Sequence, residues 1–110
     1  MNTWMTSMMS TLKDTFARAE AIRARYHALE QRLHDTPWSV EEDALAFLTD
    51  AALVGRMTMA TAGRWPTSTD ALPAKLAECV WWLAVLARRQ DIDLDAAVDA
   101  FLADKERTLP

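Results

Sequence analysis

An all-α fold is predicted for this chain of 110 residues by three observations. Good helix formers (Ala, Leu, Arg, Glu and Met) dominate the composition. Apolar residues recur in steps of three and four, which is the period of a helix face. No stretch alternates apolar and polar residues with β-branched side chains, as strands do. The length and the 51% apolar content are typical of one domain with a helical core.

The first predicted helix runs from about Thr3 to His34. Its apolar stripe indicates a helix that packs on a bundle or on a partner, and consists of Leu12, Phe16, Ala19, Ile22, Tyr26, Leu29 and Leu33. Arg23 and other charged residues are expected on the remaining faces. His27 and His34 are expected at the surface, since their spacing does not suit a helical zinc pair. Residues 1–36 form an N-terminal helical arm in this interpretation.

The second predicted helix begins after Ser39 and ends near Ala62. Ser39 and Glu42 have the spacing of a capping box, and Gly63 suits the C-terminal cap. The helix dipole favours the acids of the first turn, residues 41–43, so a structural role is preferred for them over a catalytic one.

The third and fourth predicted helices run from about Ala71 to residues 88–90 and from Asp93 into a charged tail near Arg107. Asp70 is the expected cap of the third helix, and Pro73 is tolerated in its first turn. Residues 44–62 and 74–87 are nearly all apolar, so these two helices are expected at the centre. Four helices of this size barely enclose two apolar ones, which predicts completion by an oligomer, most simply a two-fold dimer.

Net charge, apolar run length, cysteine count and the lack of known catalytic motifs argue against several kinds of function. A net charge of −4 argues against nucleic acid as the main partner. The longest uncharged apolar run is too short to cross a bilayer, and no cleaved signal is recognised, so a cytoplasmic protein without a membrane partner is expected. The single cysteine, Cys79, cannot form an internal disulfide. No nucleophile elbow and no Gly-rich phosphate loop is present.

Two isolated acids carry the functional question. Asp50 and Glu78 each lie on a nearly apolar helix, where a carboxylate is costly to bury unless a cation meets it. We therefore expect the two acids to share one cation site between neighbouring helices.

The residues around these acids resemble a known family. Lys75–Leu83 is similar to the E-L-A-D-C-L-W pattern of the MazG-like nucleoside triphosphate pyrophosphohydrolases, and Arg89–Ala97 is similar to the entry of their last helix. Residues 38–39 and 47–60 resemble the first-motif helix of the family's shorter bacterial members. The resemblance covers residues 38–107 as a family-like core within a single domain, 1–110. It implies a four-helix MazG-like bundle in which four acids bind Mg²⁺ ions, and these ions hold the phosphates of a nucleoside triphosphate.

The chain departs from the family pattern at two of the four acids. The first motif keeps Asp50 but has Leu53 at its second position, and the second motif has Lys75 first but keeps Glu78. Asp50 and Glu78 remain candidate Mg²⁺ ligands. An ammonium one turn from Glu78 opposes a divalent ion, so Lys75 is the hypothetical substitute for the metal.

Three functions stay open at this point. The first is that of an active Mg²⁺-dependent pyrophosphohydrolase. The second is that of a family member that has lost catalysis but binds a nucleotide, and the third is that of a non-catalytic helical interaction protein. Arg64 and Trp65, on the connector between the second and third helices, are the candidate ligand contacts outside the acid site.

Overall fold

The computed structural model describes residues 11–110 as four helices and no strand, which confirms the all-α class. These helices are α2 (Leu12–His34), α3 (Val40–Thr61), α4 (Leu72–Arg89) and α5 (Leu94–Thr108). The expected helix start at Thr3 and the Met-rich segment lie outside the described residues.

Side-chain caps set the beginnings of three helices. Thr11 Oγ1 accepts a hydrogen bond from the Asp14 amide at the start of α2. Ser39 and Glu42 form the predicted capping box of α3, and Asp93 caps α5 as expected. The prediction that Asp70 caps α4 is wrong. The Leu72 amide bonds to the Thr69 carbonyl, so a turn closes first and the helix begins after Ala71, without a side-chain cap.

Residues in the left-handed conformation end α3 and α4 in the same way. Gly63 has φ 72° after α3, and the Arg64 amide bonds back to the Met59 carbonyl at 2.8 Å. Asp91 has φ 56° after α4, and the Ile92 amide bonds back to the Ala87 carbonyl at 2.9 Å. This is the Schellman arrangement, which satisfies the last carbonyls of a helix. The prediction that Gly63 forms the C-terminal cap of α3 is confirmed. Asp91 adopts the same left-handed conformation, which suits glycine better than aspartate.

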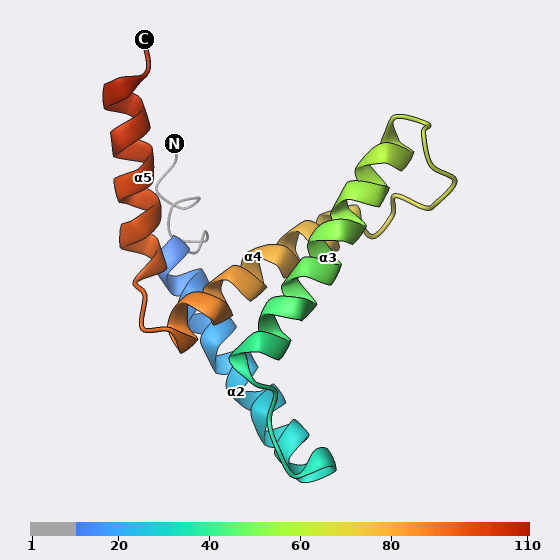
Figure 1. The fold of residues 1–110 in the computed structure, drawn as a ribbon, viewed down its shortest axis with the longest axis vertical. Coiled ribbons are helices and arrows are strands. Elements are labelled where there is room, and N and C mark those ends of the chain that lie inside the picture. The colour runs from blue at the N-terminus through green and yellow to red at the C-terminus, as the bar shows by residue number, and fades with distance from the viewer. Residues whose placement is uncertain (1–10) are drawn as a thin grey trace, which may run out of the picture.

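Helix α4 is the centre of the fold and packs against each of the other three helices. In Figure 1 it lies alongside α3, crosses α2, and leads into α5, which extends from its end. The apolar side chains that α4 buries are Trp82, Ala84, Val85 and Ala87.

The expectation of two central apolar helices is wrong for α3. The side chains that α3 buries are acids, Asp43 and Asp50, while Leu45 and Leu48 on its other side are 63% and 60% exposed. Residues 43 and 50 share one helical face and residues 45 and 48 share another, so α3 is covered by α4 on one side only.

Helices α2 and α5 also leave apolar side chains in solvent. Leu29 and Leu33 of the predicted α2 stripe are exposed, and α5 buries no residue, with Phe101 exposed. Ala19 of the same stripe does pack against α4, and its carbonyl accepts a hydrogen bond from Trp81 Nε1 at 3.1 Å. Within residues 11–110, no helix combines the length and the apolar character that crossing a membrane requires.

Candidate functional site

The structure brings Asp50 and Glu78 to one positive charge, the ammonium of Lys75. Asp50 comes from the middle of α3, while Lys75 and Glu78 lie one turn apart at the start of α4. Lys75 Nζ is 3.1 Å from Asp50 Oδ1 and 2.8 Å from Glu78 Oε1. We call these three residues the Lys75 cluster. It is half-sheltered, since the Asp50 side chain is 11% exposed and that of Glu78 40%.

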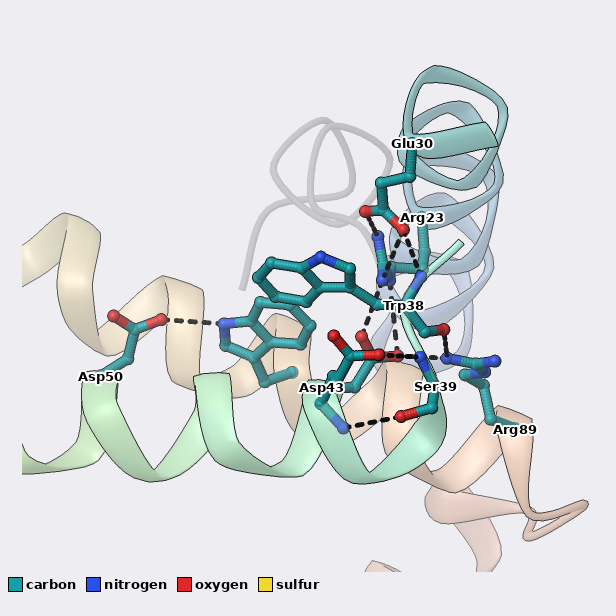
Figure 2. A network of polar contacts seen from close by, with 9 residues as sticks. Arg23, Glu30, Trp38, Ser39, Asp43, Asp50 and Arg89 are labelled. Atoms are coloured by element: carbon teal, nitrogen blue, oxygen red, sulfur yellow. Dashed lines mark hydrogen bonds and ion pairs between the residues drawn. The ribbon is translucent and has the colours of Figure 1, made fainter. Parts of the chain in front are cut away.

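Trp82 completes the environment of Asp50. Its indole Nε1, one turn beyond Glu78 on α4, donates to Asp50 Oδ2 at 2.8 Å (Figure 2). Both oxygens of Asp50 therefore have a donor. Burial alone would raise the pKa of Asp50, but the hydrogen bonds from Lys75 and Trp82 outweigh it and lower that pKa below 3.8. The hydrogen bonds to Glu78 and Asp50 raise the pKa of Lys75, so the Lys75 ammonium and the Asp50 carboxylate are both charged at neutral pH.

The donor set of the Lys75 cluster does not fit a Mg²⁺ ion well. Mg²⁺ takes an octahedral shell of oxygens, and here the ammonium already lies where the two carboxylates converge. The position one turn from Asp50 is Leu53, which offers no oxygen. In the part of the chain that is described, no group of three or more His, Cys, Asp and Glu side chains is arranged to hold a metal.

A second set of charges, which the sequence analysis missed, lies where α2, α3 and α4 meet. Asp43 is completely buried and accepts from Arg23 Nη2 at 2.7 Å and from Arg89 Nη1 at 2.8 Å. Arg23 Nη1 also donates to Glu30 Oε2 at 2.8 Å. We call Arg23, Glu30, Asp43 and Arg89 the Arg23 cluster (Figure 2). It joins three helices through charge-assisted hydrogen bonds, which are stronger than neutral ones.

The Arg23 cluster also fixes the segment between α2 and α3. Glu30 Oε1 accepts from the Trp38 amide at 2.7 Å, and Arg89 Nη1 donates to the Trp38 carbonyl at 2.8 Å. The Trp38 and Trp82 rings are nearly parallel, with an angle of 7° and centroids 6.4 Å apart. The Arg23 guanidinium lies 5.8 Å and 5.7 Å from these two centroids, within cation–π range.

Hydrogen bonding keeps Arg23 and Glu30 ionised despite their burial. Burial acts to lower the pKa of Arg23, but hydrogen bonds to Glu30 and Asp43 raise it above its ordinary value. Burial likewise acts to raise the pKa of Glu30, and hydrogen bonds from Arg23 and the Trp38 amide lower it below 4.5.

The expectation that Arg23 lies away from the packed face of the helix is wrong, since the residue is only 4% exposed. The structural role preferred for Asp43 stands, but its partners are buried arginines rather than the helix dipole alone. A seven-residue spacing could have identified both clusters. It separates Arg23 from Glu30 and Asp43 from Asp50, and on α4 it separates the members of the series Lys75, Trp82 and Arg89.

Arg64 and Trp65 do not join either cluster. Trp65 is 42% exposed, and the guanidinium of Arg56 lies 4.1 Å from its ring centroid. Arg64 is exposed at the end of α3, where its amide takes part in the helix cap. Their expected contact with a ligand remains a prediction.

Comparison with known proteins gives no relative from which to assign a function. Neither a family model nor a curated protein nor a solved structure matches this chain.

Proposed function

We propose that this chain is a non-catalytic helical oligomerisation protein of MazG-like type, in which Lys75 takes the place of a metal ion. One observation carries the proposal: the Lys75 ammonium is within 3.1 Å of both remaining acids of the site. An internal ammonium pairs with both carboxylates and balances one of their two negative charges, without a bound cation. The acid pair then connects α3 to α4 rather than holding a nucleotide.

The outer face of α3 supports an assembly role. Leu45, Leu48 and Met59 are exposed there, and Gly55 lies on the same face. A Cβ added at Gly55 would meet nothing within 4 Å, so another helix has room to approach closely. We propose that a second copy of the chain covers this face. Burying one exposed leucine contributes about 1.5–3 kcal/mol, which gives a pair of such faces a substantial driving force.

Sedimentation equilibrium of purified protein tests the assembly. We expect a dimer for the unaltered chain and a monomer for Leu48→Glu, because a charge at that position would be buried in the interface. Leu102→Glu, also on an exposed leucine but on α5, is the matched control and should remain dimeric. A monomeric unaltered chain, or equal behaviour of both variants, would contradict the proposal.

Metal and nucleotide assays test the second part of the proposal, that Lys75 replaces the metal ion and that the chain is not catalytic. We expect no pyrophosphate release from nucleoside triphosphates with Mg²⁺ or Mn²⁺, and no change of the melting temperature with either ion. The variant Leu53→Glu/Lys75→Glu should gain a metal-dependent rise in melting temperature, because it supplies four converging carboxylates. A metal-dependent rise in the unaltered chain that is lost in Asp50→Ala would refute the role proposed for Lys75.

A Mg²⁺-dependent nucleoside triphosphate pyrophosphohydrolase is the second candidate. It is favoured by the convergence of Asp50 and Glu78 from two helices on one positive charge. For this function the Lys75 side chain would have to leave the site when metal and nucleotide bind. Pyrophosphate release that disappears in Asp50→Asn and Glu78→Gln would establish it in place of the first proposal.

A further inference from the structure

A pocket separate from the Lys75 cluster lies between α2 and α4. Its volume is about 220 Å³, and neither Asp50 nor Glu78 lines it. The polar side chains around it are Glu20, Arg23, His27, Arg88 and Arg89. Three arginines and one imidazole around one pocket form a donor-rich environment that suits an anion.

The buried carboxylates near this pocket leave several arginine donors free. Asp43 and Glu30 are already engaged in the Arg23 cluster. Arg89 uses only Nη1, so its Nε and Nη2 groups make no hydrogen bond with the described residues. Arg88 Nε pairs with Glu20 at 2.9 Å, and both side chains are largely exposed at 65% and 49%. An exposed pair of this kind is weak and is readily exchanged for another anion.

His27 supplies an independent observation. It was expected at the surface, but its Nε2 atom is buried and has no hydrogen-bond partner among the described residues. Buried polar atoms nearly always have a partner, so this one calls for an explanation. Burial, followed by the positive charges of Arg23 and Arg89, lowers the pKa of His27 below 6.5.

Opposing charges surround the imidazole of His27 on every packed element. On α2 these are Glu20, Arg23 and Glu30, on α3 Asp43, and on α4 Arg88 and Arg89. The negative charges of Glu30 and Asp43 act to raise the pKa of His27, but they are outweighed. An anion in the pocket would add a further negative charge and favour the protonated imidazole.

We propose that this pocket binds a phosphate group. The phosphate oxygens would accept from Arg88, in place of the Glu20 carboxylate, and from Arg89. The His27 imidazole lines the same pocket, and a small rotation of this side chain would bring its buried Nε2 atom to the phosphate. Hydrogen phosphate carries both acceptor oxygens and an O–H donor, so it can satisfy His27 in either tautomer, whereas a carboxylate only accepts. The same chemistry is offered by inorganic phosphate and by the end group of a phosphomonoester. The proposal does not depend on the oligomerisation role.

Nuclear magnetic resonance of the two imidazoles in the full chain tests this binding. Inorganic phosphate is titrated at constant ionic strength, because a change in screening would mimic binding. We expect a saturable shift of the His27 resonances and a rise in the pKa of His27. His34, which is exposed, is the internal control and should not respond. The absence of a saturable shift at His27 would overturn the proposal.

Three variants separate a built site from general charge attraction. Arg88→Gln should weaken phosphate binding about tenfold or more, since it removes a charge-assisted hydrogen bond. Glu20→Gln should strengthen binding, because the competing carboxylate is lost. Arg107→Gln removes an exposed arginine on α5 and should leave the affinity unchanged. Equal weakening by Arg88→Gln and Arg107→Gln would show nonspecific attraction and refute the site.

A parallel titration with glycerol phosphate distinguishes the two sources of the ligand. Tighter binding of the ester indicates that the pocket recognises a phosphorylated molecule whose remainder lies at the pocket mouth. Binding of inorganic phosphate alone indicates the free anion. Both results support the phosphate site, and binding of neither refutes it.

Discussion

Replacing Asp43 with asparagine removes the negative charge at the centre of the Arg23 cluster while keeping the size of the side chain. Asp43 is fully buried and makes two close charge-assisted hydrogen bonds, at 2.7 Å to Arg23 and 2.8 Å to Arg89. Breaking a buried ion pair by removing one partner costs about 3–5 kcal/mol. Arg23 keeps Glu30 and Arg89 keeps the Trp38 carbonyl, so we expect the lower end of this range, about 3 kcal/mol.

Urea unfolding followed by circular dichroism measures this loss as a change in the free energy of unfolding. In thermal unfolding, the same loss should lower the melting temperature by roughly 10–20 °C for a domain of this size. Both proteins are compared at the same concentration, because dimer formation would make stability concentration-dependent.

Glu41→Gln is the matched control for Asp43→Asn. Glu41 is an exposed acid in the same first turn of α3, so its loss removes the same charge from the helix N-terminus. A dipole effect of this kind is worth about 0.3–1 kcal/mol. If both variants lose the same small free energy, Asp43 acts only through the helix dipole and the reasoning from the buried cluster is refuted.

Three further predictions concern single positions. Asp91→Gly should raise the free energy of unfolding by about 0.5–1 kcal/mol, since glycine adopts the φ of 56° without strain. Asp99→Gly, within α5, should lower it by about 0.3 kcal/mol, and thermal unfolding that ranks the two variants the other way would contradict this account. The pKa of His27 is lower in the folded state than its ordinary 6.5, so its contribution to stability is present above pH 6.5 and is lost as the pH falls through the folded-state pKa. Urea unfolding between pH 8 and pH 5 should show this loss of stability, and the loss should be smaller in His27→Gln. Asp50 also has a lowered pKa, so its contribution to stability is present above pH 3.8 and is lost as the pH falls further. Acid unfolding of Asp50→Asn should therefore lack part of the pH dependence of the unaltered chain. Identical acid unfolding profiles of the two proteins would exclude a stabilising Asp50–Lys75 pair.

Local sequence signals predicted most of the helix boundaries. The capping box at Ser39, the cap at Asp93 and the left-handed Gly63 each depend on a few neighbouring residues, so they could be inferred without the fold. Asp70 failed as a cap because an additional turn, closed by the Thr69 carbonyl, precedes α4. A one-residue shift of this kind, from Asp70 to Ala71, depends on the path of the connector and not on residue type alone.

The orientation of α2 could be inferred only in part from apolar spacing. The predicted stripe is right at Ala19, which is buried against α4, but Leu29 and Leu33 of the same stripe are exposed, and Arg23 is buried near Ala19 instead. A charged residue reads as solvent-exposed unless its partners are known, and the partners of Arg23 include Asp43, twenty residues away on another helix. In contrast, the encounter of Asp50, Lys75 and Glu78 was foreseeable, because a carboxylate on an apolar helix requires a nearby cation.

Trp82 contacts both the Lys75 cluster and the Arg23 cluster, so it couples their contributions to stability. Its indole nitrogen holds Asp50, while its ring faces the Arg23 guanidinium and stacks with Trp38. A rotation of this one side chain would therefore alter both groups at once. In a double-mutant cycle, losses at Asp50 and Arg23 should be non-additive even though the two residues share no direct hydrogen bond, and the coupling free energy should vanish when Trp82 is replaced by leucine.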